Sequence, residues 1–285
     1  GYRTSANGTS GGGDNNTIVG AQAGGQQATM TGGNNSILGM SAMMYATSAA
    51  GNISIGWDSA NALTTGDYNI FMGYSAGSNT NDVDYSVIIG FQAGNGVMTS
   101  AADGTIAIGY KAGNALTSGT NNTAVGYEAL LSEDTGNFNT AIGYQALKNQ
   151  NRDGTVNNTA VGYHAGLDVT TAYGATLIGS LAGHNITEGI ENTIIGNSAA
   201  ATLTTGDYNT ALGVQALATE DVGRGTTAIG YQALSTDVKG TKTVAIGYQA
   251  LFDQNFSTNT DTYNVAVGYL AGANVTTGVE NTLIG

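Results

Sequence analysis

Short apolar segments recur along this chain at a nearly fixed interval, and each ends at a glycine. Seventeen such glycines divide the 285 residues into sixteen repeats, eleven of 17 residues, four of 19 and one of 21. In every repeat the residue before the closing glycine is Val, Ile, Leu or Met, and the residue two places earlier is β-branched except at Ser36. These residues favour extended backbone. The pattern therefore predicts an all-β fold, a parallel β-solenoid of about sixteen 17-residue coils.

The predicted strands are apolar on both faces. The position between the two apolar residues is also apolar in all repeats except at Ser54, and adjacent positions of a strand point to opposite faces. A strand of this kind is typically buried on two sides. One face can line the coil interior; the other, where alanines such as Ala124 and Ala141 dominate, needs a partner surface. We expect parallel association, most simply a homotrimeric rod, although a monomer with an internal layer of helices fits the same pattern.

The rest of each repeat predicts side-chain ladders and turns. An aromatic residue follows the motif glycine in eleven repeats, and Asn precedes the strand in eleven. Stacked coils would align the aromatic rings and allow asparagine amides to hydrogen-bond from coil to coil. A glycine seven residues before the motif glycine, in ten repeats, marks a turn. Additional residues fall in the polar halves, which predicts loops on one outer face.

Composition narrows the classes of function. The chain has 45 glycines, no proline and no cysteine, so neither a disulfide framework nor a thiolate metal site is available. Its net charge of −13, with seven basic residues, argues against nucleic acid and anionic membranes as partners. No apolar run approaches the ~18 residues of a membrane span. We expect residues 1–285 to form a single repeat array, cut from a longer fibre and lacking caps.

Few residues suggest chemistry. His164 and His184 are the only histidines, and without paired zinc-site spacing we interpret both as exposed residues. Acidic residues gather in the polar halves, and we interpret them as a solvated edge that keeps the protein soluble; they are Glu133, Asp134, Asp153, Glu220, Asp221, Asp237 and Asp253. We assign no catalytic, cofactor-binding or metal-ligating residue and expect no enzyme. Asp- and Asn-rich turns leave Ca²⁺ as an alternative, although no spacing matches a known calcium loop.

Threonines form an unbroken file at the first strand position, made of Thr123, Thr140, Thr159, Thr176, Thr193, Thr210 and Thr227. Flat threonine files bind ice in several β-solenoids. Here the threonines share a face with the aliphatic file, which predicts burial. Ice binding is therefore a minor alternative that an exposed file would strengthen.

The motif resembles two groups of fibrous proteins. Segments such as Asn158–Tyr163 and Thr243–Tyr248 resemble the head repeats of YadA-like trimeric autotransporter adhesins, and Asn122–Leu130 also resembles repetitive bacteriophage tail-fibre proteins. The resemblance covers essentially the whole chain. It implies a left-handed parallel β-roll, three of which pack into a surface-exposed head. The period of 17 is longer than the usual adhesin unit, so binding properties do not carry over.

Two functions fit these observations. The first is a structural shaft segment of an extracellular or virion-borne fibre involved in surface attachment. The second is a direct adhesin that binds a host glycan, matrix or protein receptor through aromatic files or insertion loops. For the adhesin, the candidate binding residues are Trp57, Tyr127, Tyr144, Arg152 and Phe256. No nucleic acid and no membrane insertion are expected of this segment.

Overall fold

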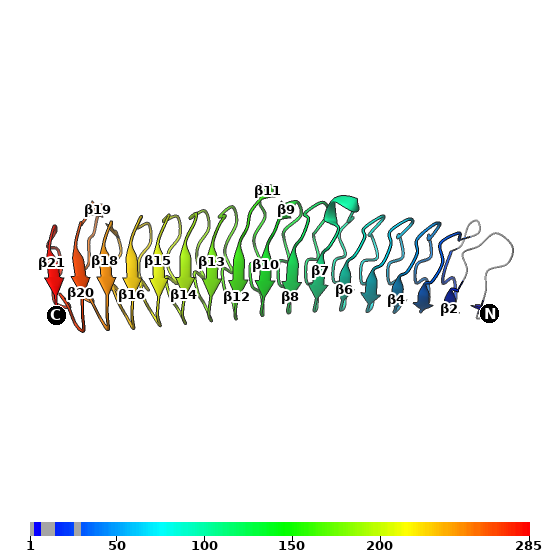
Figure 1. Ribbon diagram of the computed structural model, residues 1–285, viewed down its shortest axis with the longest axis horizontal. Helices are drawn as coiled ribbons and strands as arrows, with labels where there is room; N and C mark the ends of the chain where they lie inside the picture. The colour runs from blue at the N-terminus through cyan, green and yellow to red at the C-terminus, as the bar shows by residue number, and fades with distance from the viewer. Residues whose placement is uncertain (1–2, 7–14, 26–29) are drawn as a thin grey trace. The chain divides into compact units, whose positions relative to one another are not determined.

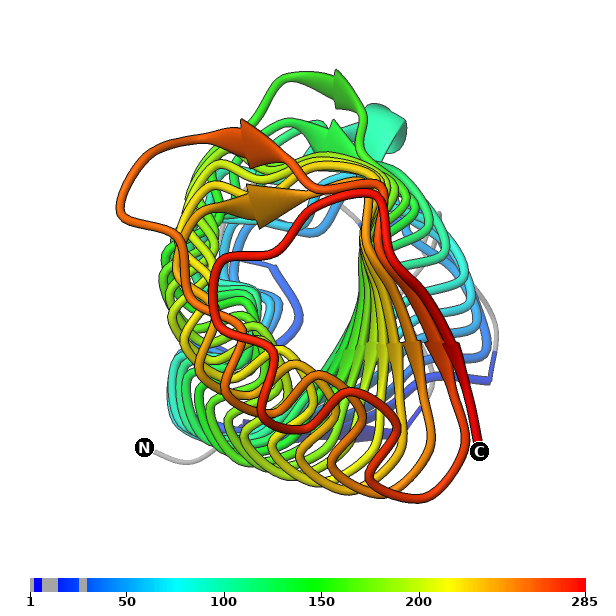
Figure 2. The same cartoon turned by 90° about the vertical axis from the view of Figure 1, so that its left-hand side faces the viewer.

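The computed structural model describes residues 3–6, 15–25 and 30–285, and these form a parallel β-solenoid. As the period predicts, the coils number about sixteen and are spaced about 17 residues apart. The chain divides into two compact units, one reaching residue 139 and including 153–155, the other comprising 140–152 and 156–285. Within each unit, the strands of successive coils lie side by side (Figure 1) and the coils superpose when viewed end-on (Figure 2).

The first unit contains β1 to β9, β11 and the 3-10 helix η1. Their bounds are β1 Arg3–Ala6, β2 Thr17–Gly20, β3 Ser36–Leu38, β4 Ile53–Ile55, β5 Ile70–Met72, β6 Val87–Ile89, η1 Ser100–Ala102, β7 Ile106–Ile108, β8 Thr123–Val125, β9 Gly136–Asn137 and β11 Gly154–Thr155. From β2 to β8 each strand pairs in parallel with the next, and β9 pairs with β11. β1 departs from this rule and pairs antiparallel with β2.

The second unit repeats the arrangement. Its strands are β10 Thr140–Ile142, β12 Thr159–Val161, β13 Thr176–Ile178, β14 Thr193–Ile195, β15 Thr210–Leu212, β16 Thr227–Ile229, β17 Gly240–Thr241, β18 Val244–Ile246, β19 Thr260–Asp261, β20 Val265–Val267 and β21 Thr282–Ile284. Equivalent positions pair in register, as Thr176 with Thr193 and Ile178 with Ile195. Because one three-residue strand per coil makes this sheet, most of each coil is turn.

The strands bury the face opposite to the one we expected. In most strands the middle residue is fully buried while its two neighbours are partly exposed, as in β8 and β12. The small-residue file, including Ala124 and Ala160, therefore lines the coil interior, and the threonine and aliphatic files face outward. The assignment of the alanines to the outer face was wrong. Larger strand-centre residues such as Phe71 and Ile194 also point inward and are fully buried.

Core volume is shared between the strand and the turn that follows it. We number positions from the motif glycine as zero. Position +4 is a buried Leu in five repeats whose strand centre is Ala, namely Leu130, Leu147, Leu217, Leu234 and Leu251. Where the strand centre is Phe71, position +4 is Gly77, and a Cβ there would lie 2.4 Å from the Phe71 ring. In this repeat the large strand centre leaves room only for glycine at position +4.

Position +7 is polar in the same five repeats that have Leu at position +4. In the five Leu-containing repeats it is Glu133, Gln150, Glu220, Asp237 or Gln254, and all five side chains are 0% exposed. In Glu133 and Glu220, Oε1 accepts the N–H of the glycine three residues later at 2.7 Å. The interpretation of Glu133, Glu220 and Asp237 as a solvated edge was wrong, because the carboxyl oxygens of these residues accept turn N–H groups inside the coil.

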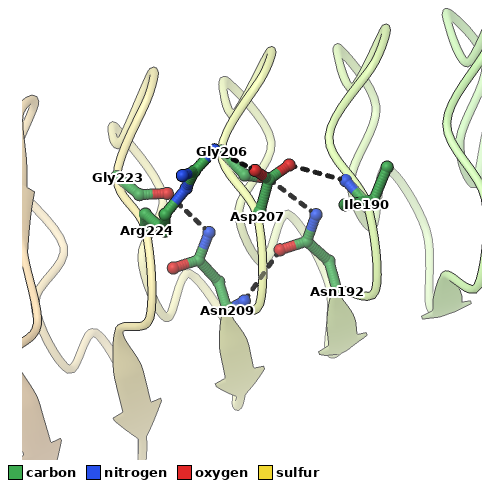
Figure 3. Close-up of polar contacts among 7 residues, drawn as sticks. All are labelled: Ile190, Asn192, Gly206, Asp207, Asn209, Gly223 and Arg224. Atoms are coloured by element: carbon green, nitrogen blue, oxygen red, sulfur yellow. Dashed lines mark hydrogen bonds and ion pairs between the residues drawn. The ribbon is translucent and has the colours of Figure 1, made fainter.

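The expected asparagine ladder is confirmed. Asn209 accepts the N–H of Thr226 at Oδ1, donates from Nδ2 to the carbonyl of Gly223 at 2.7 Å, and its own N–H binds Asn192 Oδ1 (Figure 3). The same contacts recur seventeen residues apart in the first unit, at Asn35, Asn52 and Asn69. Each amide thus satisfies two backbone groups of the following coil that the short strands leave unpaired.

Candidate functional site

The outer face of the sheet is a regular, uncharged surface in each unit. It is formed by positions −3 and −1 of every repeat, which flank the buried strand centre. Their side chains are partly exposed, with 50% for Leu38, 37% for Met72, 44% for Leu212 and 37% for Ile178. No Lys, Arg, Asp or Glu occupies either position in the sixteen repeats. Exposed apolar surface that is continuous along a sheet marks an interaction surface in soluble proteins.

Threonine hydroxyls on this outer face have no protein partner. In the second unit, position −3 is Thr140, Thr159, Thr176, Thr193, Thr210 and Thr227 in successive coils. Each is intermediate or exposed. Within the described residues, their Oγ1 atoms make no hydrogen bond to the chain, although hydroxyls elsewhere, such as Thr204 and Thr219, do. The prediction that burial would hide this file was wrong.

Aromatic rings at position +1 form the predicted ladder beside the sheet. In the first unit Trp57, Tyr74, Phe91, Tyr110 and Tyr127 stack in sequence with centroids 4.6, 5.0, 5.5 and 4.8 Å apart and interplanar angles of 10–21°. Since each ring covers the face of the next, the ladder presents mainly ring edges and hydroxyls to solvent. Few aromatic faces are therefore free for a sugar to stack on.

The second unit carries shorter ladders. Tyr144 stacks on Tyr163, and Tyr231, Tyr248 and Tyr269 stack at 5.3 and 5.1 Å. Position +2 adds an amide ladder that our sequence reasoning missed: Gln249 donates to Gln232, and Gln232 donates to Gln215, both at 2.8 Å. The signal was present as Gln at the same position of three consecutive repeats.

The five candidate binding residues do not form one site. Trp57 and Tyr127 belong to the ladder of the first unit, with 40% and 41% of each side chain exposed, and Tyr144 to a ladder of the second, with 44% exposed. Arg152 lies over the Tyr173 ring, with 4.4 Å to its centroid, and donates to the carbonyl of Thr171. Phe256 is 7% exposed and belongs to the core, so it offers no binding surface.

Charge on the outer surface is sparse, and two contacts pair a basic side chain with an acidic one. Arg224 binds Asp207 Oδ2, and Asp207 Oδ1 accepts the N–H of Ile190 from the neighbouring coil (Figure 3). Lys242 binds Asp261 at 2.5 Å, a contact that raises the pKa of Lys242 and lowers that of Asp261. Surface ion pairs of this kind contribute little to stability, so we place no recognition role on them.

Comparisons with protein-family models and with curated proteins gave no match. Among the described residues, no helix is long and apolar enough to cross a membrane. The same part of the chain has no group of three or more His, Cys, Asp or Glu side chains placed to hold a metal ion. The functional argument therefore rests on the surface just described.

Proposed function

We propose that this chain is a structural shaft segment of an extracellular or virion-borne fibre involved in surface attachment, assembled as a parallel homotrimer or another parallel homo-oligomer. The supporting observation is the outer sheet face, where two uncharged files run across coil after coil with about two fifths of several side chains exposed. A second copy of the same chain presents the same repeat length and matches this face along its whole course.

The ladders favour a structural role over a recognition role. Backbone bonds, asparagine amides and stacked rings all connect neighbouring coils. The aromatic rings that an adhesin would use to bind sugars already stack on one another. The adhesin alternative then depends on Arg152 and the surrounding polar insertion, and binding of this chain to a glycan array would support it.

The oligomeric state tests the proposal directly. We expect light scattering to give a multiple of 28.6 kDa, three chains in the simplest case, and small-angle scattering to give an elongated particle. Leu212→Lys, on the outer face, should shift the mass toward the single chain because burying a Lys in each protomer is costly. Val97→Lys is the control, since Val97 is also exposed (52%) but lies outside the sheet. A parent protein of 28.6 kDa would contradict the oligomer.

Ice binding is a second candidate, favoured by the exposed threonine file. A single-chain particle would leave the file and the flanking aliphatic methyl groups open to water. In that case we expect thermal hysteresis from the parent protein and its loss in Thr193→Lys, with Thr202→Lys, in a turn, as the control. Absence of hysteresis from a monomeric protein would eliminate this candidate.

A further inference from the structure

The only two histidines of the chain lie against each other. His164 at position +2 and His184 on the following coil are twenty residues apart, and their ring centroids are 5.7 Å apart. His164 also stacks on Tyr163 at 3.9 Å, which fixes the plane of its ring. Position +2 is Gln in six other repeats, so the motif itself does not require a histidine here.

Hydrogen bonding fixes which nitrogen of His184 is free. Its Nδ1 lies 2.5 Å from Asn185 Oδ1 and 3.9 Å from Asp168 Oδ2. Both neighbours are acceptors, so Nδ1 carries the proton and the lone pair of the neutral ring is on Nε2. This arrangement, in which the second nitrogen donates to an oxygen, orients metal-ligating imidazoles in proteins.

His164 contributes a nitrogen without a partner. Its Nε2 is buried and has no hydrogen bond. A ring nitrogen without a hydrogen-bond partner can offer its lone pair to a metal ion.

We propose that His164 and His184 form a two-histidine site for a divalent transition metal of the zinc class, bound through the Nε2 atoms. Imidazole is a preferred ligand of such ions, and the two rings lie with centroids 5.7 Å apart. Asp168, beside His184, supplies the nearby negative charge, against the positive charge of Lys148. Because the ligands come from neighbouring coils, the ion would join these coils within the second unit.

Titration of the full chain with ZnCl₂ tests the site. Calorimetry should show one zinc ion per chain, with affinity falling about 10- to 100-fold in His164→Gln and in His184→Asn. Both variants place in the site a residue that other repeats carry there, Gln at 145 and Asn at 114, so we expect both to fold. Asp253→Asn, an exposed carboxylate away from the pair, should bind like the parent.

Two further readouts separate the site from background binding by acidic groups. Zinc should raise the melting temperature of the parent and not of His164→Gln, and binding should weaken as the pH falls below about 6, where imidazoles protonate. Equal zinc affinity in the parent and both histidine variants would overturn the proposal, as would the absence of zinc binding by the parent.

Discussion

Substitution of one motif glycine by alanine should destabilise the second unit by more than about 4 kcal/mol, an exceptional effect for one methyl group. Gly196 has φ +142°, and a Cβ there would lie 2.2 Å from the carbonyl oxygen of Gly213 on the next coil. The strained backbone alone costs about 1–3 kcal/mol. The clash adds to this, because the oxygen belongs to the backbone and cannot rotate away. We therefore expect Gly196→Ala to force neighbouring coils apart.

Gly225→Ala is the matched control. Gly225 also has positive φ (+66°), but a Cβ there would have no atom within 4 Å. We expect only the backbone penalty of about 1–2 kcal/mol. Thermal unfolding followed by circular dichroism measures both variants, and hydrogen exchange locates the loss in Gly196→Ala to β14 and β15. Equal destabilisation by the two substitutions would mean that close approach of the coils does not explain the motif glycine.

Much of the fold follows from the repeat. The period and the β-branched residues predict the parallel solenoid, and Asn at position −4 predicts the amide ladder that Asn192 and Asn209 form. The repeat did not show which face of each strand turns inward, because both faces are apolar. The inward face becomes visible only when Ala at the strand centre is read together with Leu at position +4.

The burial of Glu133, Glu220 and Asp237 was the feature of the core that the sequence predicted least well. Glu and Asp are rarely fully buried, so Glu133, Glu220 and Asp237 read singly as solvated residues. Read by position, they belong to one file with Gln150 and Gln254. Among the described residues, this file accepts both acids and amides, but only in repeats with Leu at position +4, which indicates an inward site with turn N–H groups to satisfy.

The contacts of the candidate site could also be predicted only in part from the sequence. The aromatic ladder was predictable because it needs only alignment of position +1 in stacked coils. The contact between His164 and His184 was not, since these residues occupy different positions of their repeats, +2 and +5. Only the path of the turn brings the two rings within 5.7 Å.

The stability of the second unit should fall as the pH rises from about 5 to 8, because Glu220 is held protonated in the fold. Burial, and then the neighbouring Asp237, raises the pKa of Glu220 from 4.5 to about 8. Asp237, whose pKa burial also raises, lies at the same position of the next coil and accepts a bond from Gln254 at 2.6 Å. No cation pairs with Glu220 among the described residues, since Arg224 binds Asp207 at the surface.

The sign follows from proton linkage. Below pH 4.5 the folded and unfolded chains are both protonated at Glu220, and its contribution to stability is fully present. Between pH 4.5 and 8 the unfolded chain loses this proton while the folded chain keeps it, so the free energy of unfolding falls, by about 5 kcal/mol in total. Above pH 8 the folded protein also ionises, and the loss is complete.

Glu220→Gln should remove this dependence and make the protein more stable than the parent at pH 8. Gln occupies the same position at 150 and 254, and its amide would place a donor where Glu220 Oε2, a buried atom without a hydrogen-bond partner, now lies. Denaturant unfolding from pH 5 to 9 measures the effect. Glu280→Gln, at an exposed position, controls for the loss of one negative charge and should follow the parent. Parallel pH profiles for the parent and Glu220→Gln would show that Glu220 is ionised in the folded coil. The turn N–H groups at Gly223 would then suffice to hold a buried carboxylate charged at neutral pH.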